Sequence, residues 1–375
     1  MEDIKRVQLS EIVELITKGA TPTTLGYEFQ DEGVNFLKIE CFDENGGFIE
    51  SKVAHISEEC HKKMKRSQLK NGDILFSIAG AIGRVAIVTE EMLPANINQA
   101  LAIIRISDEQ VYLPYIKLIL TSPIVIEQFE RKKQGVAQLN LSLKDINEIS
   151  IPLPSKDEQI ELAELFDKVV GVISKRNKEL SALDDLIKAR FVEMFGDPVS
   201  NPLGWEKKML KTVCVKLNDG THFSPESFVE GEYKYVTAKN IKESGFDFTN
   251  ITYVSEAVHR PIYERCNPEL GDVLYIKDGV TTGIAMVNTL NEEFTLLSSV
   301  ALLKQNRKIM DGYFLAAVLN NENMYSDIRS NMGGAAITRL TIAKLNMIQI
   351  IVPPLKLQQQ FADFVHQVDK SKVAV

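Results

Sequence analysis

The stretch GVAQLNLSLKDINEISIPLPSKDEQ, residues 135–159, joins a polar loop and a short alternating run to a proline stop and the start of a helix. GAAITRLTIAKLNMIQIIVPPLKLQ, residues 334–358, has the same layout 199 residues further along the chain. A loop–strand–proline–helix junction that occurs twice in one chain indicates an internal repeat, which decides how the rest of the sequence is read.

Four more blocks of sequence support this repeat. NGDILFSIAGAIGRVAIV (71–88) matches LGDVLYIKDGVTTGIAMV (270–287), VNFLKIECF (34–42) matches YKYVTAKNI (233–241), LAIIR (101–105) matches VALLK (300–304), and QLSEIVELITKG (8–19) resembles MLKTVCVKLNDG (209–220). A period near 199 is much longer than the roughly 20–50 residues of solenoid repeats. Each copy is therefore predicted to be a domain with its own core.

Each copy is rich in short β-branched or alternating runs, which are typical of strands. In the first copy these are Val34–Ile39, Ile74–Ile78, Val85–Val88, Leu101–Ile106 and Ile149–Leu153, and a helical stretch lies around Pro114–Lys133. Strands at short intervals with few helical crossovers indicate an α+β domain, and we expect a curved antiparallel β-sheet with flanking helices.

Between the two copies lies a long uninterrupted helical pattern. Ser155 and Glu158 form a capping box directly after Pro154, and Gly196 followed by Pro198 gives the stop signal. At 1.5 Å per residue such a helix is about 60 Å long. Its apolar residues recur at steps of 3, 4 and 7, which predicts a coiled-coil seam: Leu162, Phe166, Val169, Ile173, Leu180, Leu183, Ile187 and Met194.

The second copy is followed by a shorter helix of the same kind. Phe361, Val365 and Val368 occupy the places of Leu162, Phe166 and Val169, so we expect the two helices to pair antiparallel. The sequence ends at Val375, the equivalent of Arg176. The second helix is therefore expected to be truncated relative to the first, or the remaining seam to be covered by another chain.

Composition limits the class of protein. The net charge of −8 over 375 residues argues against a generally basic nucleic-acid coat, although Lys and Arg cluster in 61–70, 131–134 and 205–211. The four cysteines have no paired spacing, which indicates free thiols in a reducing compartment and no metal site. No apolar run reaches the ~20 residues that span a bilayer, and no signal peptide is apparent. We expect a cytoplasmic protein that does not bind membranes.

Motifs for catalysis are missing. The sequence has no GxxxxGK[ST] phosphate loop, no GxGxxG fingerprint and no GxSxG nucleophile elbow, and its five histidines are isolated. The pairs Gly80/Gly83 and Gly279/Gly283 lie between strand-like runs, where glycines of tight turns are expected. We therefore predict no catalytic, cofactor-binding or metal-binding residue, and a layout suited to binding.

The central helix, IPLPSKDEQIELAELFDKVVGVISKRNKELSALDDLIKARFVEMFGDP, resembles that of the specificity subunit of Type I restriction–modification systems. GDILFSIAGAIGR and GDVLYIKDGVTTG resemble the strand–glycine signature of the target-recognition domains of this family. The resemblance covers the whole chain. It predicts a first target-recognition domain (1–154), a central conserved helix (155–196), a second target-recognition domain (197–353) and a C-terminal conserved helix (354–375).

This resemblance implies a subunit that is not itself a catalyst. Each domain would read one half of a bipartite, asymmetric site in double-stranded DNA, and the helices would set the spacing and dock the modification (methyltransferase) subunits. Restriction (helicase/nuclease) subunits would complete a site-specific deoxyribonuclease and adenine-N6 methyltransferase complex. S-adenosylmethionine, Mg²⁺ and ATP would belong to those partners, and no cofactor would be bound directly.

The sequence also fits other kinds of protein. The chain could be a truncated or silent specificity subunit that folds without assembling, a protein-interaction scaffold that does not bind DNA, or a self-sufficient methyltransferase or nuclease. A homodimer formed through the exposed helix seam is a further alternative to a monomer.

Candidate DNA-binding residues lie in polar and basic loops, because base reading needs directed donors and acceptors while Lys and Arg bind phosphates. In the first domain they are Lys62, Lys63, Lys65, Arg66, Ser77, Arg84, Arg131, Lys132, Lys133, Gln134, Gln138 and Asn140. In the second domain they are Lys277, Thr281, Thr282, Arg329, Asn331, Thr338 and Arg339.

Overall fold

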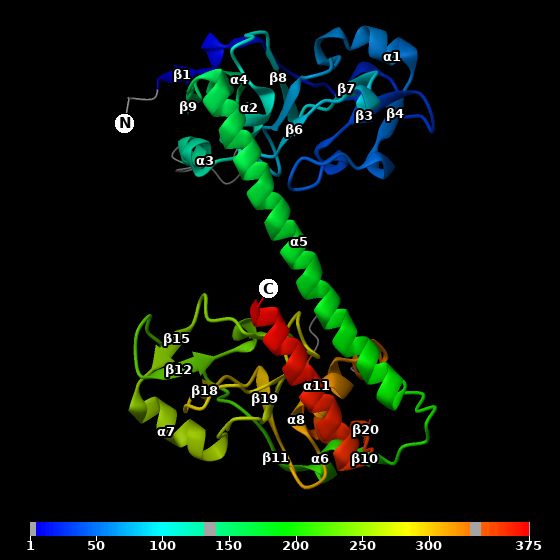
Figure 1. Ribbon diagram of the computed structural model, residues 1–375, viewed down its shortest axis with the longest axis vertical. Helices are drawn as coiled ribbons and strands as arrows, with labels where there is room; N and C mark the ends of the chain where they lie inside the picture. Colours follow the sequence, from blue (N-terminus) through cyan, green and yellow to red (C-terminus); the bar gives the residue numbers. More distant parts are fainter. Residues whose placement is uncertain (1–4, 131–139, 331–338, 375) are drawn as a thin grey trace. The chain divides into compact units, whose positions relative to one another are not determined.

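The computed structural model describes residues 5–130, 140–330 and 339–374. The chain forms two compact units, unit 1 (residues 1–173) and unit 2 (174–375), and the division lies inside one long helix. This helix, α5, runs from Lys156 to Phe195 (Figure 1). The expected central helix is therefore present, but it is not a separate unit, because its first half belongs to unit 1 and its second half to unit 2.

The described part of unit 1 contains short strands and four short α-helices besides its half of α5. The strands are β1 (Arg6–Gln8), β2 (Val13–Lys18), β3 (Val34–Leu37), β4 (Ala54–Ile56), β5 (Ile74–Ser77), β6 (Val85–Ile87), β7 (Ala95–Ile97), β8 (Leu101–Ile106) and β9 (Ser150–Pro152). The helices are α1 (Glu58–Lys63), α2 (Leu113–Leu120), α3 (Pro123–Glu130) and α4 (Leu143–Asn147). The helical stretch predicted around 114–133 is thus two helices, which separate just before Pro123.

Unit 2 repeats this order. Its strands are β10 (Lys207–Met209), β11 (Cys214–Asp219), β12 (Tyr233–Val236), β13 (Ile241–Lys242), β14 (Gly245–Phe246), β15 (Thr252–Val254), β16 (Val273–Ile276), β17 (Ala285–Val287), β18 (Thr295–Leu296), β19 (Val300–Gln305) and β20 (Gln349–Ile351). Its helices are α6 (Leu210–Val213), α7 (Glu256–Arg265), α8 (Gly312–Asn320), α9 (Glu322–Ser330), α10 (Ile342–Met347) and α11 (Leu355–Ala374).

The sheets of the two units have the same topology. A four-stranded antiparallel sheet has the order β2-β8-β5-β6 in unit 1 and β11-β19-β16-β17 in unit 2. A three-stranded sheet has the order β4-β3-β7 in unit 1 and β15-β12-β18 in unit 2. In each three-stranded sheet one pair is parallel, β3 with β7 and β12 with β18. The expectation of a single antiparallel sheet is therefore too simple.

The strand registers confirm the repeat residue by residue. Leu75 pairs with Ile103 in unit 1, and Leu274 pairs with Leu302 in unit 2, each 199 residues later. The first strands differ, since Thr17 faces Ile103 and Asn218 faces Leu302, a displacement of 201. The connection between β2 and β3 in unit 1 is two residues longer than the connection between β11 and β12 in unit 2, and from β12 on the displacement is 199.

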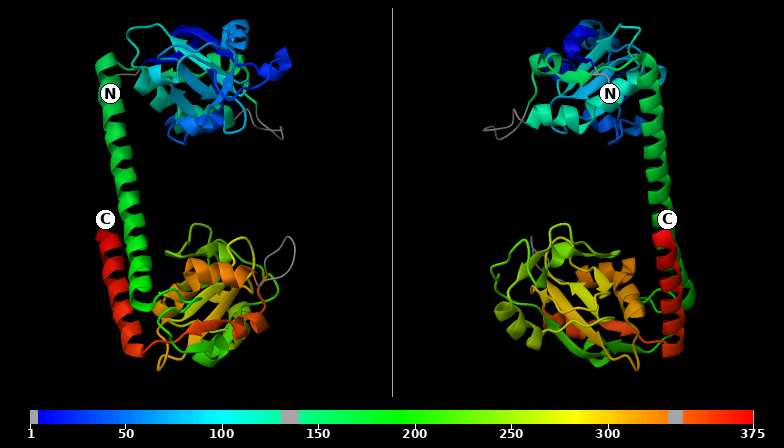
Figure 2. Two further views of the ribbon diagram at one scale, coloured as in Figure 1. Left: turned by 90° about the vertical axis from the view of Figure 1, so that its right-hand side faces the viewer. Right: turned by 60° about the vertical axis from the view of Figure 1, so that its left-hand side comes forward.

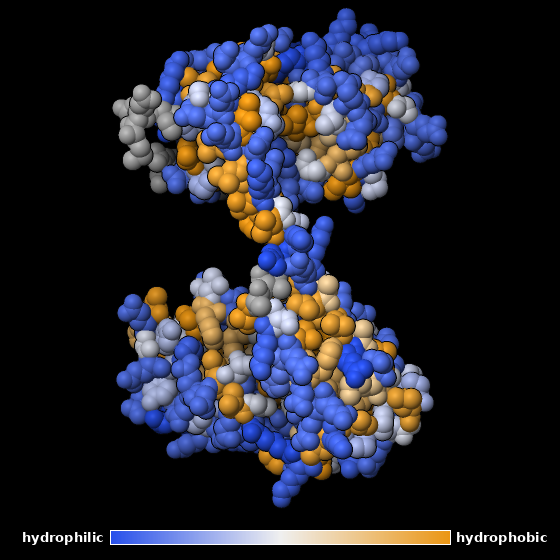
Figure 3. Space-filling view, viewed as in Figure 1, coloured by the Kyte–Doolittle hydropathy of each residue, from blue (hydrophilic) through white to orange (hydrophobic). Residues whose placement is uncertain are grey.

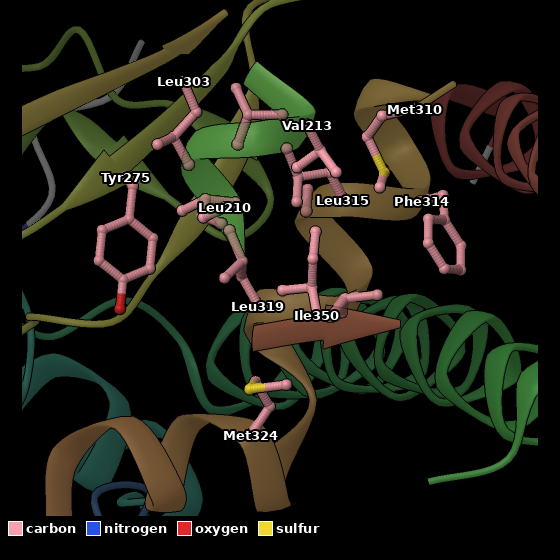
Figure 4. Packing of buried hydrophobic residues seen from close by; sticks show 14 of the residues in the cluster. Leu210, Val213, Tyr275, Leu303, Met310, Phe314, Leu315, Leu319, Met324 and Ile350 are labelled. Atoms are coloured by element: carbon pink, nitrogen blue, oxygen red, sulfur yellow. The ribbon is translucent and has the colours of Figure 1, made fainter. Parts of the chain in front are cut away.

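Both faces of the four-stranded sheet are covered, so each unit has three layers. In unit 1, alternate residues of β5 and β8 pack against α2, α3 and α4 on one face, and against strands of the three-stranded sheet on the other. Every residue of β5 and of β16 is consequently buried, which explains why these strands read as continuous apolar runs. Figure 4 shows the corresponding helix-side core of unit 2, where Tyr275 and Leu303 of the sheet lie near Leu315 and Leu319 of α8.

The ends of α5 follow the signals in the sequence. The Glu158 carboxylate accepts the Ser155 backbone N–H at 2.9 Å, and the Ser155 Oγ accepts the Glu158 N–H at 3.4 Å, which completes the capping box. At the other end Gly196 has a left-handed φ of 72°, a conformation that glycine adopts without the steric cost of a Cβ. Among the described residues, no helix has both the length and the apolarity that crossing a membrane requires.

Candidate nucleic-acid interface and helix pair

A glycine loop connects a central strand of the four-stranded sheet to the neighbouring edge strand in each unit. Residues 78–84 link β5 to β6, and residues 277–284 link β16 to β17. Gly80 and Gly83 have φ values of 74° and 87°, and Gly279 and Gly283 have values of 105° and 115°. These left-handed conformations confirm that the glycines form tight turns between strands.

A second segment meets the glycine loop in each unit. The Leu141 N–H donates to the Ile78 carbonyl at 3.0 Å, and the Leu340 N–H donates to the Lys277 carbonyl at 2.8 Å. These contacts bring Asn140 and Arg339, which directly precede the two leucines, to the same edge as the loops. The candidates Arg131, Lys132, Lys133, Gln134, Gln138, Asn331 and Thr338 lie outside the described residues.

Lys277 is buried in unit 2, and this corrects its assignment as a DNA contact. Its side chain is 2% exposed, and its Nζ lies 2.9 Å from the Asp278 carboxylate and 3.4 Å from the Asp219 carboxylate. A buried ammonium is stable only when it is paired in this way. Arg339 completes the cluster, since its Nε lies 3.4 Å from Asp278. Lys277 therefore stabilises the loop through ion pairs within unit 2.

Four other candidates also make contacts within their own unit. The buried Ser77 hydroxyl donates to the Ala79 carbonyl at 3.0 Å, and the buried Thr282 hydroxyl donates to Gly279 at 2.6 Å. The guanidinium of Arg84 donates to the Phe42 carbonyl at 2.9 Å. The guanidinium of Arg329 donates to the Thr282 carbonyl at 3.0 Å. These contacts hold the loops in shape. Ser77 and Thr282, which the sequence offers as DNA-binding candidates, are buried, and this corrects their assignment as DNA contacts.

What remains exposed at the loop edges differs between the units. Asn140 is exposed in unit 1, and Thr281 and Arg339 are exposed in unit 2. Val280, which the sequence did not single out, is 93% exposed at the tip of the unit 2 loop; its counterpart by the 199-residue register is Ala81. The same scaffold therefore presents different side chains at one equivalent edge.

The basic cluster of unit 1 lies on a separate part of the surface. Lys62, Lys63, Lys65 and Arg66 are all exposed on α1 and the turn that follows it. Lys62 forms an ion pair with Glu58 at 3.3 Å, and both side chains are largely exposed. Figure 1 shows α1 and α3 at opposite ends of unit 1. The cluster is available to phosphates and lies away from α3.

The Gly-Asp pair before each central strand has a structural role. Asp73 is 1% exposed and binds Arg105 of β8 through both carboxylate oxygens at 2.6 Å. Asp272 is fully buried and binds Lys304 of β19 at 2.8 Å. Both pairs of positions are separated by 199 residues. The hydrogen bonds to Asp73 raise the pKa of the Arg105 guanidinium, as expected for a charge-assisted bidentate pair.

In unit 2, α11 packs antiparallel to the second half of α5 (Figure 2). The Phe361 ring lies 5.6 Å from Phe191 and 5.8 Å from Phe195. Lys372, near the C-terminal end of α11, has its ammonium 2.7 Å from the carboxylate of Asp184, which precedes Phe191 and Phe195 on α5. The two helices therefore run in opposite directions. The predicted antiparallel pairing is confirmed here. Of the predicted seam residues, Phe361, Val365 and Val368 are buried, and Leu180, Leu183, Ile187 and Met194 are half-buried.

Phe191 and Phe195 form the centre of this pair and were missed in the sequence. Both are nearly or fully buried, and the Phe195 ring also contacts Phe314 of α8 at 4.7 Å. They follow Ile187 at steps of four, so the signal was present. The predicted seam passed instead from Ile187 to Met194, seven residues further on.

The first half of α5 carries an unpaired apolar stripe, the α5 stripe. The predicted residues Leu162, Phe166, Val169 and Ile173 are between 45% and 55% exposed, and Leu165 and Val172 extend the same surface. Figure 3 shows apolar side chains gathered along this part of the helix. Through the repeat, Leu162 corresponds to Phe361, which a helix covers completely in unit 2. Among the described residues, the α5 stripe thus leaves exposed Leu162, Phe166 and Val169, whose counterparts on α11 are buried.

A protein-family model described as the Type I restriction modification DNA specificity domain matches residues 1–182 and 202–375. The chain belongs to this Type I specificity family. The match explains the two equivalent units, since the family model fits the chain twice.

Similar proteins of the specificity family are found by sequence and by structure. The chain is 22% identical to the Type I restriction enzyme MjaIX specificity subunit of Methanocaldococcus jannaschii, over 97% of this chain and 85% of that protein. It is 32% identical to the EcoBI specificity subunit of Escherichia coli, but only over 44% of this chain and 35% of that protein. A solved structure of the specificity subunit from M. genitalium superposes with a TM-score of 0.55 at 16% identity, covering 100% of this chain and 92% of that chain.

A chain from a structure describing the assembly and conformational transition of a Type I system gives the same TM-score of 0.55 at 18% identity, over 99% of this chain and 91% of that chain. At such low identity these superpositions support the fold of the specificity family. Among the described residues, no group of three or more His, Cys, Asp or Glu side chains is placed to hold a metal ion.

Proposed function

We propose that this chain is the DNA sequence-recognition subunit of a Type I restriction–modification complex. Each unit would read one half of a bipartite, asymmetric site in double-stranded DNA. One observation carries the proposal: two units with the same scaffold present different exposed side chains at the same loop edge. That is the arrangement needed to bind two different short sequences with one type of module.

Base reading is proposed for the exposed loop edges, and phosphate binding for the basic surface. Asn140 in unit 1, and Thr281 and Arg339 in unit 2, have polar groups that suit hydrogen bonds to base edges. Lys62, Lys63, Lys65 and Arg66 suit phosphates, because charge contacts of this kind position a protein without reading sequence. A local basic surface is required, since the chain as a whole carries a net charge of −8.

The chemistry of the complex is proposed to belong to its partners. Modification subunits would supply S-adenosylmethionine and methylate adenine, and restriction subunits would use ATP and Mg²⁺ to cleave DNA. The α5 stripe is the proposed docking surface for a helix of the modification subunit, because the equivalent positions of α11 are covered by a helix. The complex would act in the cytoplasm, where the DNA is.

The test is co-expression with a modification subunit in a host without DNA methylation, followed by sequencing that detects N6-methyladenine. An asymmetric two-part motif with a constant gap is the expected result. A symmetric motif would mean that one unit is used twice, through a homodimer formed on the α5 stripe. Absence of methylation with a folded, soluble chain and a bound modification subunit would contradict the proposed role.

A second measurement tests the docking surface. Replacing Phe166 with Glu puts a charge into the α5 stripe and is expected to abolish co-purification of the modification subunit. Lys168→Glu, a charge change at an exposed position of the same helix segment, is the control and should leave co-purification intact. Equal binding by both variants would place the docking surface elsewhere.

A further inference from the structure

A buried glutamine lies in the first turn of each long helix. Gln159 of α5 is 1% exposed, and Gln358 of α11 is fully buried. Each is the last residue of one of the two junction sequences quoted above, so they are 199 residues apart. Buried amides of this kind need partners for both their oxygen and their nitrogen.

In unit 1 the amide of Gln159 bridges two segments of backbone. Its Oε1 accepts the Tyr112 N–H at 2.9 Å. Its Nε2 donates to the Gln110 carbonyl at 3.2 Å and to the Pro154 carbonyl at 2.9 Å. The helix is thereby fastened to the segment that leads into α2 and to its own proline junction.

In unit 2 Gln358 makes the same three bonds. Its Oε1 accepts the Asp311 N–H at 2.9 Å, and its Nε2 donates to the Ile309 carbonyl at 3.1 Å and to the Pro353 carbonyl at 2.7 Å. Every partner is displaced by 199 residues from its counterpart in unit 1. The six bonds therefore form two copies of one joint, here called the glutamine joint.

The chemistry of the joint requires an amide. A carboxylate in its place offers no N–H for the two carbonyl groups, and an aliphatic side chain satisfies none of the three backbone groups. An unpaired buried backbone group costs more than a made hydrogen bond contributes. All the partners are backbone atoms, so the joint depends on the path of the chain and tolerates different side chains there.

The joint lies in the first turn of each helix, where α5 and α11 begin. It connects rigid parts: the first turn of a helix, a proline turn and the segment before α2 or α8. Fixing both ends of this connection sets the direction in which the helix leaves the domain. Neighbouring glutamines do not share this role, since Gln359 and Gln360 are exposed.

We propose that Gln159 and Gln358 are positioning residues that fix each recognition domain on its helix and thereby set the gap between half-sites that the chain accepts. The part concerning DNA rests on the proposed function. The part concerning the fixed direction of the helix stands on the six hydrogen bonds alone, and two separate measurements test the two parts.

The first measurement is the distance distribution between two spin labels in unit 1, one at Lys63 on α1 and one at Lys168 on α5, in the full chain. Both positions are exposed, and Cys214→Ser removes the one native cysteine that is not fully buried. We expect a narrow distribution in the parent and a distinctly broader or shifted one in Gln159→Leu. Gln359→Leu is the matched control and should leave the distribution unchanged.

If Gln159→Leu does not fold, Gln159→Met repeats the measurement with an unbranched side chain of similar length. A distribution in either folded variant that equals the parent overturns the positioning role, whatever the chain does to DNA. This outcome is independent of the methylation experiment.

The second measurement uses co-expression with the modification subunit and a plasmid library in which the two half-sites are separated by gaps of different length. The parent should methylate one gap length. Gln159→Leu and Gln358→Leu should lose methylation at that gap and gain it at gaps about one base pair longer or shorter, because the domains reach the DNA at less fixed positions. Gln359→Leu should behave like the parent.

A single unchanged gap in both joint variants overturns the link between the joint and the gap. A parent that methylates nothing contradicts the proposed function instead, and the spin-label distances then decide whether the joint fixes the helix.

Discussion

Single buried charges distinguish the two units at the residue scale. Lys277 and Asp278 occupy the positions of Ile78 and Ala79, so unit 2 has an ion cluster where unit 1 has apolar side chains. Removing one member of a buried ion cluster leaves the others uncompensated, at a cost of about 3–5 kcal/mol.

We therefore expect Lys277→Met to lower the free energy of unfolding of unit 2 by about 3–5 kcal/mol. Chemical denaturation followed by tryptophan fluorescence measures this, because Trp205 is the only tryptophan and belongs to unit 2. Lys308→Met, at an exposed position of the same unit, is the control. A loss no larger than that of the control would mean that the cluster does not stabilise the loop.

His259 is expected to make the stability of unit 2 depend on pH. Its side chain is fully buried and stacks on Tyr233 with ring centroids 3.9 Å apart. Its ring nitrogens contact the Thr295 hydroxyl at 2.8 Å and the Glu293 carboxylate at 3.2 Å. Burial is the largest influence and lowers the pKa of His259 below its ordinary value of 6.5, despite the opposing effect of Glu293.

The unfolded chain thus binds a proton at His259 more readily than the folded chain does. The contribution of His259 to stability is complete above pH 6.5 and is lost as the pH falls below that value. The free energy of unfolding is measured at about pH 7.5 and about pH 5.5, one unit above and below the ordinary pKa of histidine. Between these two values, His259→Gln should lose less unfolding free energy than the parent. Equal losses in the two proteins would exclude His259 as the cause.

At the scale of elements, the pairing of α5 with α11 in unit 2 rests on aromatic packing. Phe361 is fully buried against Phe191 and Phe195. Truncating such a side chain loses its burial and leaves a cavity, which typically costs about 3–5 kcal/mol.

Phe361→Ala should therefore destabilise unit 2 by about 3–5 kcal/mol in denaturation followed by Trp205 fluorescence. The Trp205 indole donates to the Phe195 carbonyl at 3.0 Å, so its emission reports directly on this packing. The control is Leu162→Ala, the repeat equivalent in unit 1, which is 45% exposed and should cost far less as measured by thermal unfolding. Similar losses of stability in Phe361→Ala and Leu162→Ala would contradict the finding that Phe361 is buried against a helix while Leu162 is exposed.

Element type and order could be predicted from the sequence because the local signals agree with the fold. The capping box and Gly196 mark the limits of α5, and Leu101–Ile106 is a strand with the bounds expected. The parallel pairing of β3 with β7 could not be predicted, because it joins segments far apart in sequence and leaves no local pattern. Gln159 was overlooked, and Lys277 was wrongly predicted to contact DNA, for a related reason. Whether a polar side chain is buried depends on its neighbours in the folded structure, which the local sequence does not show.

The whole molecule is acidic, so its contact with DNA has to be concentrated on part of its surface. Binding driven by phosphate contacts weakens linearly in log–log form as salt rises, with a slope of about −0.9 for each contact. The exposed cluster Lys62, Lys63, Lys65 and Arg66 is the proposed source of such contacts in unit 1.

Changing all four of these residues to Glu should weaken binding to duplex DNA and make the salt slope shallower by about 0.9 for each contact that is lost. Affinities measured between low and moderate salt give the slope. Lys175→Glu/Lys178→Glu, a charge change on the exposed surface of α5, is the control and should leave the slope unaltered. An unchanged slope in the quadruple variant would remove the cluster from the interface.

The glutamine joint also has a consequence for inheritance. Gln159 and Gln358, 199 residues apart, stand at the two ends of an interval that begins and ends on equivalent joints, each with three equivalent backbone partners. A gene segment that encodes this interval could be exchanged by recombination for another of its kind, in frame, without altering the fastening of either helix. Natural variation would then replace one reading surface at a time and leave the connecting framework intact.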